Sequence, residues 1–383
     1  MTLRELIYRV AESFTGVEPG TNGPWRTAQT PVRNSAHWLI LFSWVYSATN
    51  KEKYLDVVAR LAEYLVSREA RPHGFTFYNL REHQANQANG LIGQAWVFEA
   101  LAEATRVLQN DRYAAVAEEV FLQHPFSERY GLWHSVEPDG RVLSVHSTLN
   151  QQVWFAATAA RLPGPRSPEV KARVLKFMDR VEGHLHILGK GLLGMHVRSL
   201  PPTDGSGVKR MIRAVLRRWP DRVEDLRYLF ASRASGSCSR PTLFRYLDMS
   251  LGYHAFSLYG LALLRAAVPH HPFWNSRSLR RVLLWTQSRQ YKSELEGNTF
   301  AFGYNPTGFE VPYVLTVFGP YGEAGTGDPV GECRWWIQEQ VRRCYDPAEG
   351  RFRRNTADPA TLTSRLYEAT RLPQWLLETE LAI

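Results

Sequence analysis

Tyr130-Gly131-Leu132-Trp133 is the clearest copy of a glycine-plus-apolar segment that recurs between stretches of helical pattern. The other copies are His73-Gly74-Phe75, Lys190-Gly191-Leu192-Leu193-Gly194, Phe302-Gly303-Tyr304 and, more weakly, Glu349-Gly350-Arg351-Phe352. The successive steps from Gly74 to Gly131, Gly191, Gly303 and Gly350 are 57, 60, 112 and 47 residues, and 112 is twice 56. Repeats on this scale are typical of arrays of supersecondary units, and this one predicts a closed ring of helical hairpins.

Helical periodicity predicts twelve helices that fall into two alternating sets. One set carries many charges on one face and is expected to form the outer ring, at 2–14, 51–69, 111–124, 167–187, 274–291 and 330–345. The other set is smoother and more apolar, as expected for a buried inner ring, and lies at 34–48, 91–108, 148–161, 248–267, 309–318 and 359–376. Six such pairs predict an all-α (α/α)6 toroid in which residues 1–383 form a single domain.

The glycine segments fall after an outer helix and before the next inner helix. We expect each glycine to supply the left-handed turn that ends the outer helix. The apolar residues that follow are expected to run extended, as short β-like hairpins at one mouth of the ring. Every inner helix then begins at that same mouth.

Residues 198–240 interrupt the alternation of outer and inner helices and are expected to form an insertion. From Arg198 to Arg245 there are eleven Lys and Arg against four Asp and Glu, whereas the whole chain has a net charge of +9. The basic character is therefore a local patch. Within it, 207–219 has the pattern of an amphipathic basic helix, which would serve as a lid over an anionic chain, as a peripheral membrane contact, or as a solvated face packed on the ring.

Composition and missing motifs narrow the class of protein. No window approaches 18 apolar residues, so no membrane span is expected, and the charged N-terminal helix does not resemble a signal peptide. The three cysteines lack metal-binding spacing and fit a reducing compartment, which predicts a cytoplasmic location. Phosphate-loop, dinucleotide, HExxH and GxSxG motifs are missing, so we expect no metal, no cofactor and no nucleic-acid partner. The oligomeric state stays open.

The predicted starts of the inner helices are unusually polar for core-facing positions, and they define a candidate ligand site. The candidate binding residues are Trp25, Arg33, Asn34, His37, Trp38, Glu82, His83, Asn89, Trp133, His134, Asn150, Tyr304 and Asn305. Helix capping alone would explain some of them, Asn34 for example. It does not require several histidines and tryptophans at one mouth.

The chemistry of this mouth favours an acidic sugar. Helix N-termini carry partial positive charge and attract anions, and Arg33 reinforces this attraction. Aromatic faces suit the apolar faces of pyranose rings, and amide side chains suit hydroxyl groups. The expected partner is therefore an anionic oligosaccharide or polysaccharide.

Two sets of residues are candidates for catalysis. Glycoside hydrolysis needs a carboxylic acid near the leaving oxygen and usually a second carboxylate. Glu310, one turn before Tyr313, and Asp248, at the predicted start of the most apolar inner helix, are the first candidates. Tyr253 and His254 are candidates for proton transfer instead.

The sequence resembles the six-hairpin glycosidase superfamily. The resemblance is carried by Asn89-Gly90-Leu91-Ile92-Gly93-Gln94-Ala95-Trp96, with Pro31-Val32-Arg33-Asn34 before it and Gly131-Leu132-Trp133 after it. It is nearest to glycosidase-like proteins of surface-glycan assembly clusters and more distant from unsaturated glucuronyl hydrolases. It implies an (α/α)6 fold, no metal and a substrate of the uronic-acid type.

The departures from this superfamily leave three functions open. The resemblance to unsaturated glucuronyl hydrolases implies catalytic aspartates at the second and third inner-helix starts, where this chain has Glu82, Asn86 and Asn150. The first hypothesis is a glycosidase-type enzyme that uses Glu310 and Asp248. The second is a uronate lyase that uses Asn, His, Tyr and Arg. The third is a non-catalytic glycan-binding or assembly protein in surface-polysaccharide or protein-glycan biosynthesis.

Overall fold

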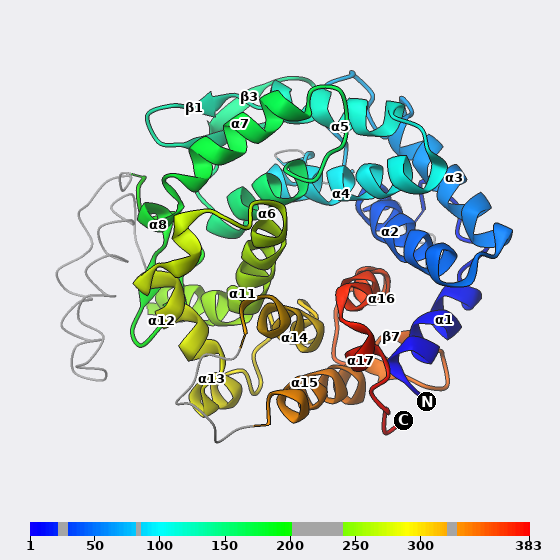
Figure 1. Cartoon of the computed structure of the whole chain (residues 1–383), viewed down its shortest axis with the longest axis vertical. Coiled ribbons are helices and arrows are strands. Elements are labelled where there is room, and N and C mark those ends of the chain that lie inside the picture. The colour runs from blue at the N-terminus through cyan, green and yellow to red at the C-terminus, as the bar shows by residue number, and fades with distance from the viewer. Residues whose placement is uncertain (22–29, 82–85, 201–239, 320–327) are drawn as a thin grey trace.

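A computed structural model describes residues 1–21, 30–81, 86–200, 240–319 and 328–383. The described helices form two concentric rings (Figure 1). The inner ring runs through α2 (Pro31–Thr49), α4 (Gly90–Leu108), α6 (Leu149–Ala159), α11 (Arg240–Ala267), α14 (Thr307–Phe318), and the pair α16 (Pro359–Ser364) and η4 (Arg365–Arg371). Each packs against the next, and α16 and η4 return to α2. The (α/α)6 toroid is therefore confirmed.

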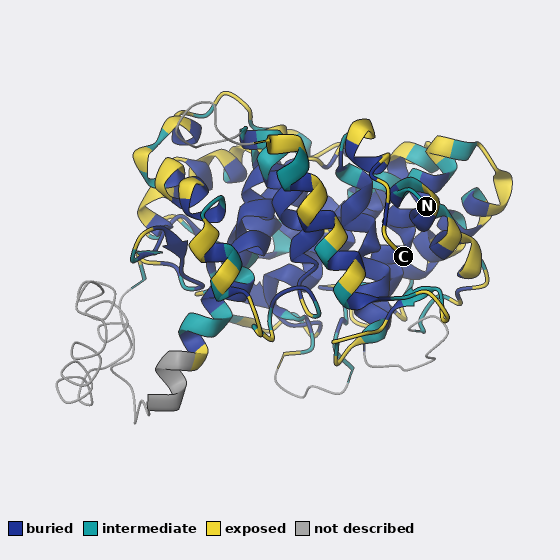
Figure 2. Ribbon diagram, turned by 90° about the horizontal axis from the view of Figure 1, so that it is seen from below, coloured by how far each residue is buried: buried dark blue, intermediate teal, exposed yellow. Residues whose placement is uncertain are grey.

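The outer elements cover this inner ring, and nearly all lie close to their expected ranges. They are α1 (Leu3–Ser13), α3 (Glu52–Val66), α5 (Arg112–Gln123), α7 (Ser167–Met178), α8 (Val181–His184), η3 (Pro272–Asn275), α12 (Arg277–Thr286), α13 (Arg289–Glu294) and α15 (Pro329–Cys344). Buried residues concentrate between the two rings and along the inner helices (Figure 2). This burial follows from the apolar stripes of the outer helices, which face the nearly all-apolar inner ones.

The two ends of the chain close the ring. Helix α1 packs against α17 (Gln374–Leu377). The Leu3 amide donates to the Thr379 carbonyl at 3.0 Å, and Arg4 forms an ion pair with Glu378 at 2.8 Å. The first and last hairpins are therefore neighbours, although they are separated by the length of the sequence (Figure 1).

Three of the five glycine segments, at Gly131, Gly191 and Gly350, form strand hairpins, but not in the way we expected, whereas those at Gly74 and Gly303 lie in turns or bends without strands. Short antiparallel strands pair as β1 (Phe126–Ser127) with β2 (Leu132–Val136), β2 with β3 (Val142–Val145), β4 (Ile187–Leu188) with β5 (Leu192–Leu193), and β6 (Tyr345–Asp346) with β7 (Arg351–Phe352). Gly131 has φ +69° and sits in the turn between β1 and β2, whereas the residue that caps α5 is His124, in extended conformation. The glycine with a left-handed backbone therefore closes the β1–β2 hairpin that follows α5. It does not end the helix itself.

Three other expectations about inner and outer helices are corrected. Helix α11 begins at Arg240, so Asp248 lies inside the helix and does not cap it. The predicted helix at 359–376 is divided into α16, the 3₁₀ helix η4 and α17. The predicted outer helix at 167–187 ends early, because 187–188 form strand β4.

The turn at Gly303 tolerates no side chain. Phe302 just before it has φ +42°, a conformation that bulky residues rarely adopt. A Cβ on Gly303 would collide with the backbone oxygen of Asn355. Two loops from different hairpins thus meet backbone to backbone, which fixes the position of Tyr304.

We therefore expect Gly303→Ala to lower the free energy of unfolding by about 1–3 kcal/mol, the usual cost of overpacking. Gly183→Ala is the matched control, because a Cβ there meets nothing within 4 Å and lies in helix α8. Urea unfolding followed by circular dichroism measures both variants. If the two variants were equally stable, the predicted collision at Gly303 would be wrong.

Candidate functional site

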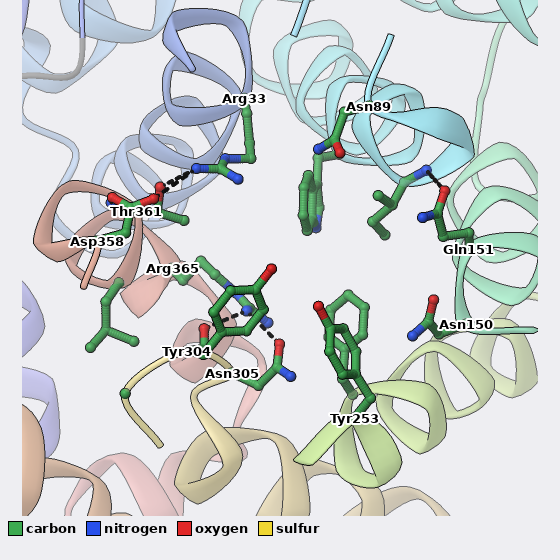
Figure 3. Close-up of a pocket in the computed structure, with 15 residues that line it drawn as sticks. Arg33, Asn89, Asn150, Gln151, Tyr253, Tyr304, Asn305, Asp358, Thr361 and Arg365 are labelled. Carbon is green, nitrogen blue, oxygen red and sulfur yellow. Dashed lines mark hydrogen bonds and ion pairs between the residues drawn. The ribbon is translucent and has the colours of Figure 1, made fainter. Parts of the chain in front are cut away.

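A cavity of about 140 Å³ opens at the end of the ring where the inner helices begin. Its walls come from α2, α4, α6, α11, the 303–305 turn, α16 and η4 (Figure 3). It is lined by Arg33, Asn89, Ile92, Trp96, Asn150, Gln151, Tyr253, Phe256, Gly303, Tyr304, Asn305, Asp358, Thr361, Leu362 and Arg365. Clefts that bury drug-sized ligands are about 300–1,000 Å³, so this cavity suits one sugar ring.

Arg33 forms one wall of the pocket from the first turn of α2. Its Nη2 donates to Asp358 Oδ2 at 3.0 Å, to Thr30 Oγ1 at 3.2 Å and to Thr361 Oγ1. Asp358 in turn caps α16, because its Oδ1 accepts from the Thr361 amide at 3.0 Å. Within the part of the chain that the structure describes, none of these bonds uses Nη1 of Arg33, which leaves that nitrogen for a ligand.

Arg365 lies at the base of the pocket and is almost entirely buried. Its Nη2 donates to Glu310 at 3.0 Å and its Nε to Glu368 at 2.7 Å. Its Nη1 donates to the Tyr304 carbonyl at 3.1 Å and to Asn305 Oδ1 at 2.9 Å. The guanidinium thus joins two buried carboxylates to the turn that carries Tyr304.

The two glutamates share more negative charge than one guanidinium neutralises. Burial raises the pKa of Glu310 well above its ordinary value, and repulsion from Glu368 raises it further, while Arg365 opposes both effects. Burial alone would lower the pKa of Arg365, but the two carboxylates raise it. Each carboxylate also has an Oε2 atom without a partner. Burial and mutual repulsion therefore favour uptake of a proton by Glu310.

Tyr253 from α11 and Tyr304 from the 303–305 turn face each other in the pocket, with ring centroids 5.8 Å apart (Figure 3). Burial raises the pKa of the Tyr253 hydroxyl well above 10, and its hydrogen bond and proximity to Tyr304 add to this. Tyr304 is half-exposed. Tyr253 is thus a protonated, desolvated hydroxyl at neutral pH, with a more exposed partner.

Amide side chains form the opposite wall. Asn89 precedes α4 in a left-handed conformation, with φ +56°. Gln151 Oε1 accepts from the Leu91 and Ile92 amides at 2.9 and 3.2 Å, so a side chain of α6 caps α4. Asn150 is 2% exposed, and its Nδ2 has no partner.

The structure brings together some of the predicted residues and separates others from the pocket. Those that line it are Arg33, Asn89, Asn150, Tyr253, Tyr304 and Asn305. Trp25, Glu82, His83 and the 207–219 segment fall outside the described residues. The remaining candidates lie elsewhere, as follows.

The two predicted acids do not meet at the pocket. Glu310 is fully buried behind Arg365. Asp248 is half-buried and accepts from Asn298 Nδ2 at 2.7 Å, and neither residue belongs to the pocket lining. Burial raises the pKa of Asp248.

His254 is part of the core and not of the mouth. It is fully buried, accepts from the Leu193 amide at 3.0 Å and contacts Thr286 Oγ1 at 2.9 Å. Burial lowers its pKa to about 3. It joins β5 to α12 as a neutral imidazole.

The other predicted binding residues support the walls. His37 lies behind the pocket, where it contacts Ser364 Oγ at 3.2 Å, and Asn34 accepts from Thr361 Oγ1 at 3.2 Å. Trp38 and Trp133 are fully buried packing residues. His134 contacts the Leu143 carbonyl within its hairpin.

Sequence reasoning missed several lining residues, of which Asp358, Arg365, Gln151, Thr361, Trp96 and Phe256 are polar or aromatic. The Asp358-Pro359 pair is a helix-start signal that would have found the first. Arg365 gave no signal, because it lies in a 3₁₀ helix whose spacing departs from 3.6. Within the described ranges no cluster of three or more His, Cys, Asp or Glu is arranged to hold a metal, and no helix there is long and apolar enough to cross a membrane.

Comparison with solved structures places this fold among sugar enzymes. D-mannose isomerase matches with a TM-score of 0.59, 12% identity and 96% of each chain covered. Cellobiose 2-epimerase from Spirochaeta thermophila matches with a TM-score of 0.57, 12% identity and coverage of 96% of this chain and 97% of that one. A variant of an unsaturated glucuronyl hydrolase, with dGlcA-Glc-Rha-Glc, matches with a TM-score of 0.55, 11% identity and coverage of 99% and 97%. At these identities the likeness shows the fold alone.

Comparison of sequences is more specific. No family model matches the chain. Archaeal glycosylation protein Q of Haloferax volcanii is 36% identical over 358 residues, which cover 93% of this chain and 91% of the relative. With this identity over nearly the full length, the chain belongs to the archaeal glycosylation protein Q family, and its fold is the closed ring of helical hairpins described above.

Proposed function

We propose that the protein is a glycan-assembly enzyme that binds an acidic sugar in this pocket and moves a proton at the carbon next to the sugar carboxylate. The name of its relative supports a role in glycosylation. The observation that carries the proposal is the pocket lining, whose described residues combine two arginines and two tyrosines with a single carboxylate, Asp358.

The arginines suit a carboxylate. Arg33 is desolvated, since burial lowers its pKa despite the opposing effect of Asp358, and its Nη1 points to no protein acceptor among the described residues. Charge-assisted hydrogen bonds are strong in such an environment. A carboxylate held there loses much of its negative charge, which stabilises the enolate formed when the adjacent C–H proton is removed.

The tyrosines suit the proton transfer. Tyr253 takes the proton from the sugar carbon as a phenolate, after its own proton has passed to solvent through Tyr304; Arg365 and Arg33, whose charges lower its pKa, favour this anion. Return of a proton to the opposite face of the carbon gives an epimer and consumes no other reactant, whereas return to the same face restores the substrate. Loss of a leaving group from the neighbouring carbon gives an unsaturated sugar, which is the lyase alternative.

The carboxylate-pair hydrolysis that we first considered receives less support from the site. Asp358 is occupied by Arg33 and by the cap of α16, and Glu310 is buried with Arg365. Asn89 and Asn150 stand at the starts of the second and third inner helices, where the resemblance to unsaturated glucuronyl hydrolases implies aspartates. An amide has no proton to give to a leaving oxygen.

Incubation with glucuronate-terminated oligosaccharides in D₂O tests the proposal. We expect deuterium to appear at the carbon next to the carboxylate, seen as a mass increase and as loss of one proton NMR signal. Tyr253→Phe is expected to slow this exchange by about 10²–10⁴-fold, the usual contribution of a general acid or base. Tyr345→Phe is the matched control, because Tyr345 is a buried tyrosine that lies outside the pocket.

Other outcomes of this experiment would overturn the proposal. Release of a free sugar without deuterium would favour hydrolysis by carboxylates. Binding without exchange or release would favour the non-catalytic assembly protein. Exchange accompanied by new ultraviolet absorbance would support the proton transfer and identify the reaction as elimination.

A further inference from the structure

Three successive amide side chains begin helix α6, and they have different surroundings. Gln152 is occupied on both sides, since its Oε1 accepts from the Trp133 amide at 3.0 Å and its Nε2 donates to the Trp133 and His146 carbonyls, both at 2.9 Å. Gln151 caps α4 through Oε1. These two residues therefore have structural roles that account for them.

Asn150 has no comparable role. It lines the pocket and is 2% exposed, yet its Nδ2 has no hydrogen-bond partner. An unpaired buried amide donor costs about 1–3 kcal/mol, and natural proteins rarely leave one without a reason. The orphaned donor at the cavity wall thus indicates an acceptor atom that belongs to a ligand.

The position of Asn150 says which part of the ligand it meets. Figure 3 shows Asn150 across the cavity from Thr361 and Asp358, the residues that hold Arg33. A sugar ring whose carboxylate meets Arg33 therefore presents its far edge to Asn150. On a pyranose, that edge carries hydroxyl groups.

We propose that Asn150 is a specificity-determining residue that donates a hydrogen bond to one hydroxyl oxygen of the bound sugar, on the edge remote from the carboxylate. This inference rests on the proposed function, because it uses the carboxylate to orient the ring. It adds that the protein distinguishes sugars by the presence of that hydroxyl. A site built to hydrogen-bond a hydroxyl rejects the analogue that lacks it much more strongly than an apolar site would.

Calorimetric titration with methyl glucuronide and its 2-, 3- and 4-deoxy analogues tests this inference. For the wild type we expect one deoxy analogue to bind about 5- to 150-fold more weakly than the parent, the equivalent of one unpaired buried donor, and the other two to bind within a few-fold. Asn150→Ala is expected to weaken the parent and to abolish the difference between the parent and that one analogue. Asn150→Asp, which replaces the donor with an acceptor, is the second variant, and thermal melts establish that both are folded.

Asn110→Ala is the matched control, since Asn110 is an exposed residue outside the pocket lining. This variant should reproduce the wild-type pattern of affinities.

The inference would be overturned if Asn150→Ala distinguished the parent sugar from its deoxy analogues as well as the wild type does. It would also be overturned if Asn150→Ala bound every sugar with unchanged affinity, which would mean that Asn150 binds an ordered water only. If the wild type binds glucose and its deoxy analogues in the same pattern but not the glucuronide, the proposed function fails and the role of Asn150 stands. If it binds none of these sugars, both fail.

Discussion

Arg365→Met is expected to lower the free energy of unfolding at pH 7 by about 3–5 kcal/mol, whereas Glu310→Gln is expected to change it by less than about 1 kcal/mol. Removing one partner of a buried ion pair leaves an uncompensated charge in a medium of low polarity. In Arg365→Met, Glu310 and Glu368 both lose their ion-pair partner, which raises the pKa of Glu368 and favours its protonation as well. The side chains of Glu310 and Glu368 are fully buried, so water cannot replace the lost charge of Arg365.

Glu310→Gln is expected to change the free energy of unfolding little, because of the balance of charges around Arg365. Two carboxylates face one guanidinium, and the pKa of Glu310 is raised by burial and by Glu368, so the folded protein favours the protonated form at this position. A glutamine resembles that protonated acid and keeps an oxygen for Arg365 Nη2. Glu310→Gln combined with Glu368→Gln leaves Arg365 without an anion and should be as damaging as Arg365→Met.

The pH dependence provides a second measurement. A carboxyl group whose folded pKa is raised is stabilised by its proton, so the stability it contributes is lost as pH rises above its unfolded value near 4.5. The defect of Arg365→Met should therefore grow from pH 6 to pH 8 in urea unfolding experiments. A loss of stability as large for Glu310→Gln as for Arg365→Met would contradict this account of the charges.

Below pH 6.5 the stability of the wild type is expected to fall, since each buried histidine whose pKa is lowered contributes about 1.4 kcal/mol per pH unit. Burial lowers the pKa of His124 and His184 to about 4, and that of His186 and His254 to about 3. The unfolded chain binds protons at these residues near pH 6.5, while the folded protein does not. The unfolded state therefore binds more protons, and stability rises with pH through this interval.

His124→Gln isolates one of these contributions. His124 is fully buried, and its Nδ1 contacts the Val120 carbonyl at 2.8 Å, a contact that an amide can keep. The slope of unfolding free energy against pH between 5 and 6 should fall by about 1.4 kcal/mol per unit in this variant. The same slope in variant and wild type would mean that His124 takes up its proton without unfolding.

The ring could be predicted from the sequence because its signals are local. Helical periodicity and the glycine segments each depend on a few neighbouring residues, and together they placed the hairpins correctly. The exceptions are also local: η4 is a 3₁₀ helix, so the spacing that marks an inner helix fails at Arg365. The early start of α11 at Arg240 displaced Asp248 from the predicted helix end.

The site was predicted less completely, because a sequence shows which residues begin a helix but not which way they face. Asn150 and Gln152 are two residues apart, and only Asn150 lines the pocket. Glu310 lies in the first turn of α14 as expected, yet it turns toward Arg365, 55 residues later. Such pairings across the ring arise only when the toroid closes. The sequence of either segment alone does not indicate them.

Closure of the ring by its two chain ends determines when the pocket can form during folding. Arg33 and Asp358 are 325 residues apart in sequence, so the wall they share is a seam between the first hairpin and the last. A chain that has folded only its first five hairpins has α2, α4 and α6 but no complete pocket. Contacts of such long range are slow to form, and a ligand that binds only the closed ring stabilises it by mass action. Sugar binding would thus report that the ring has been completed.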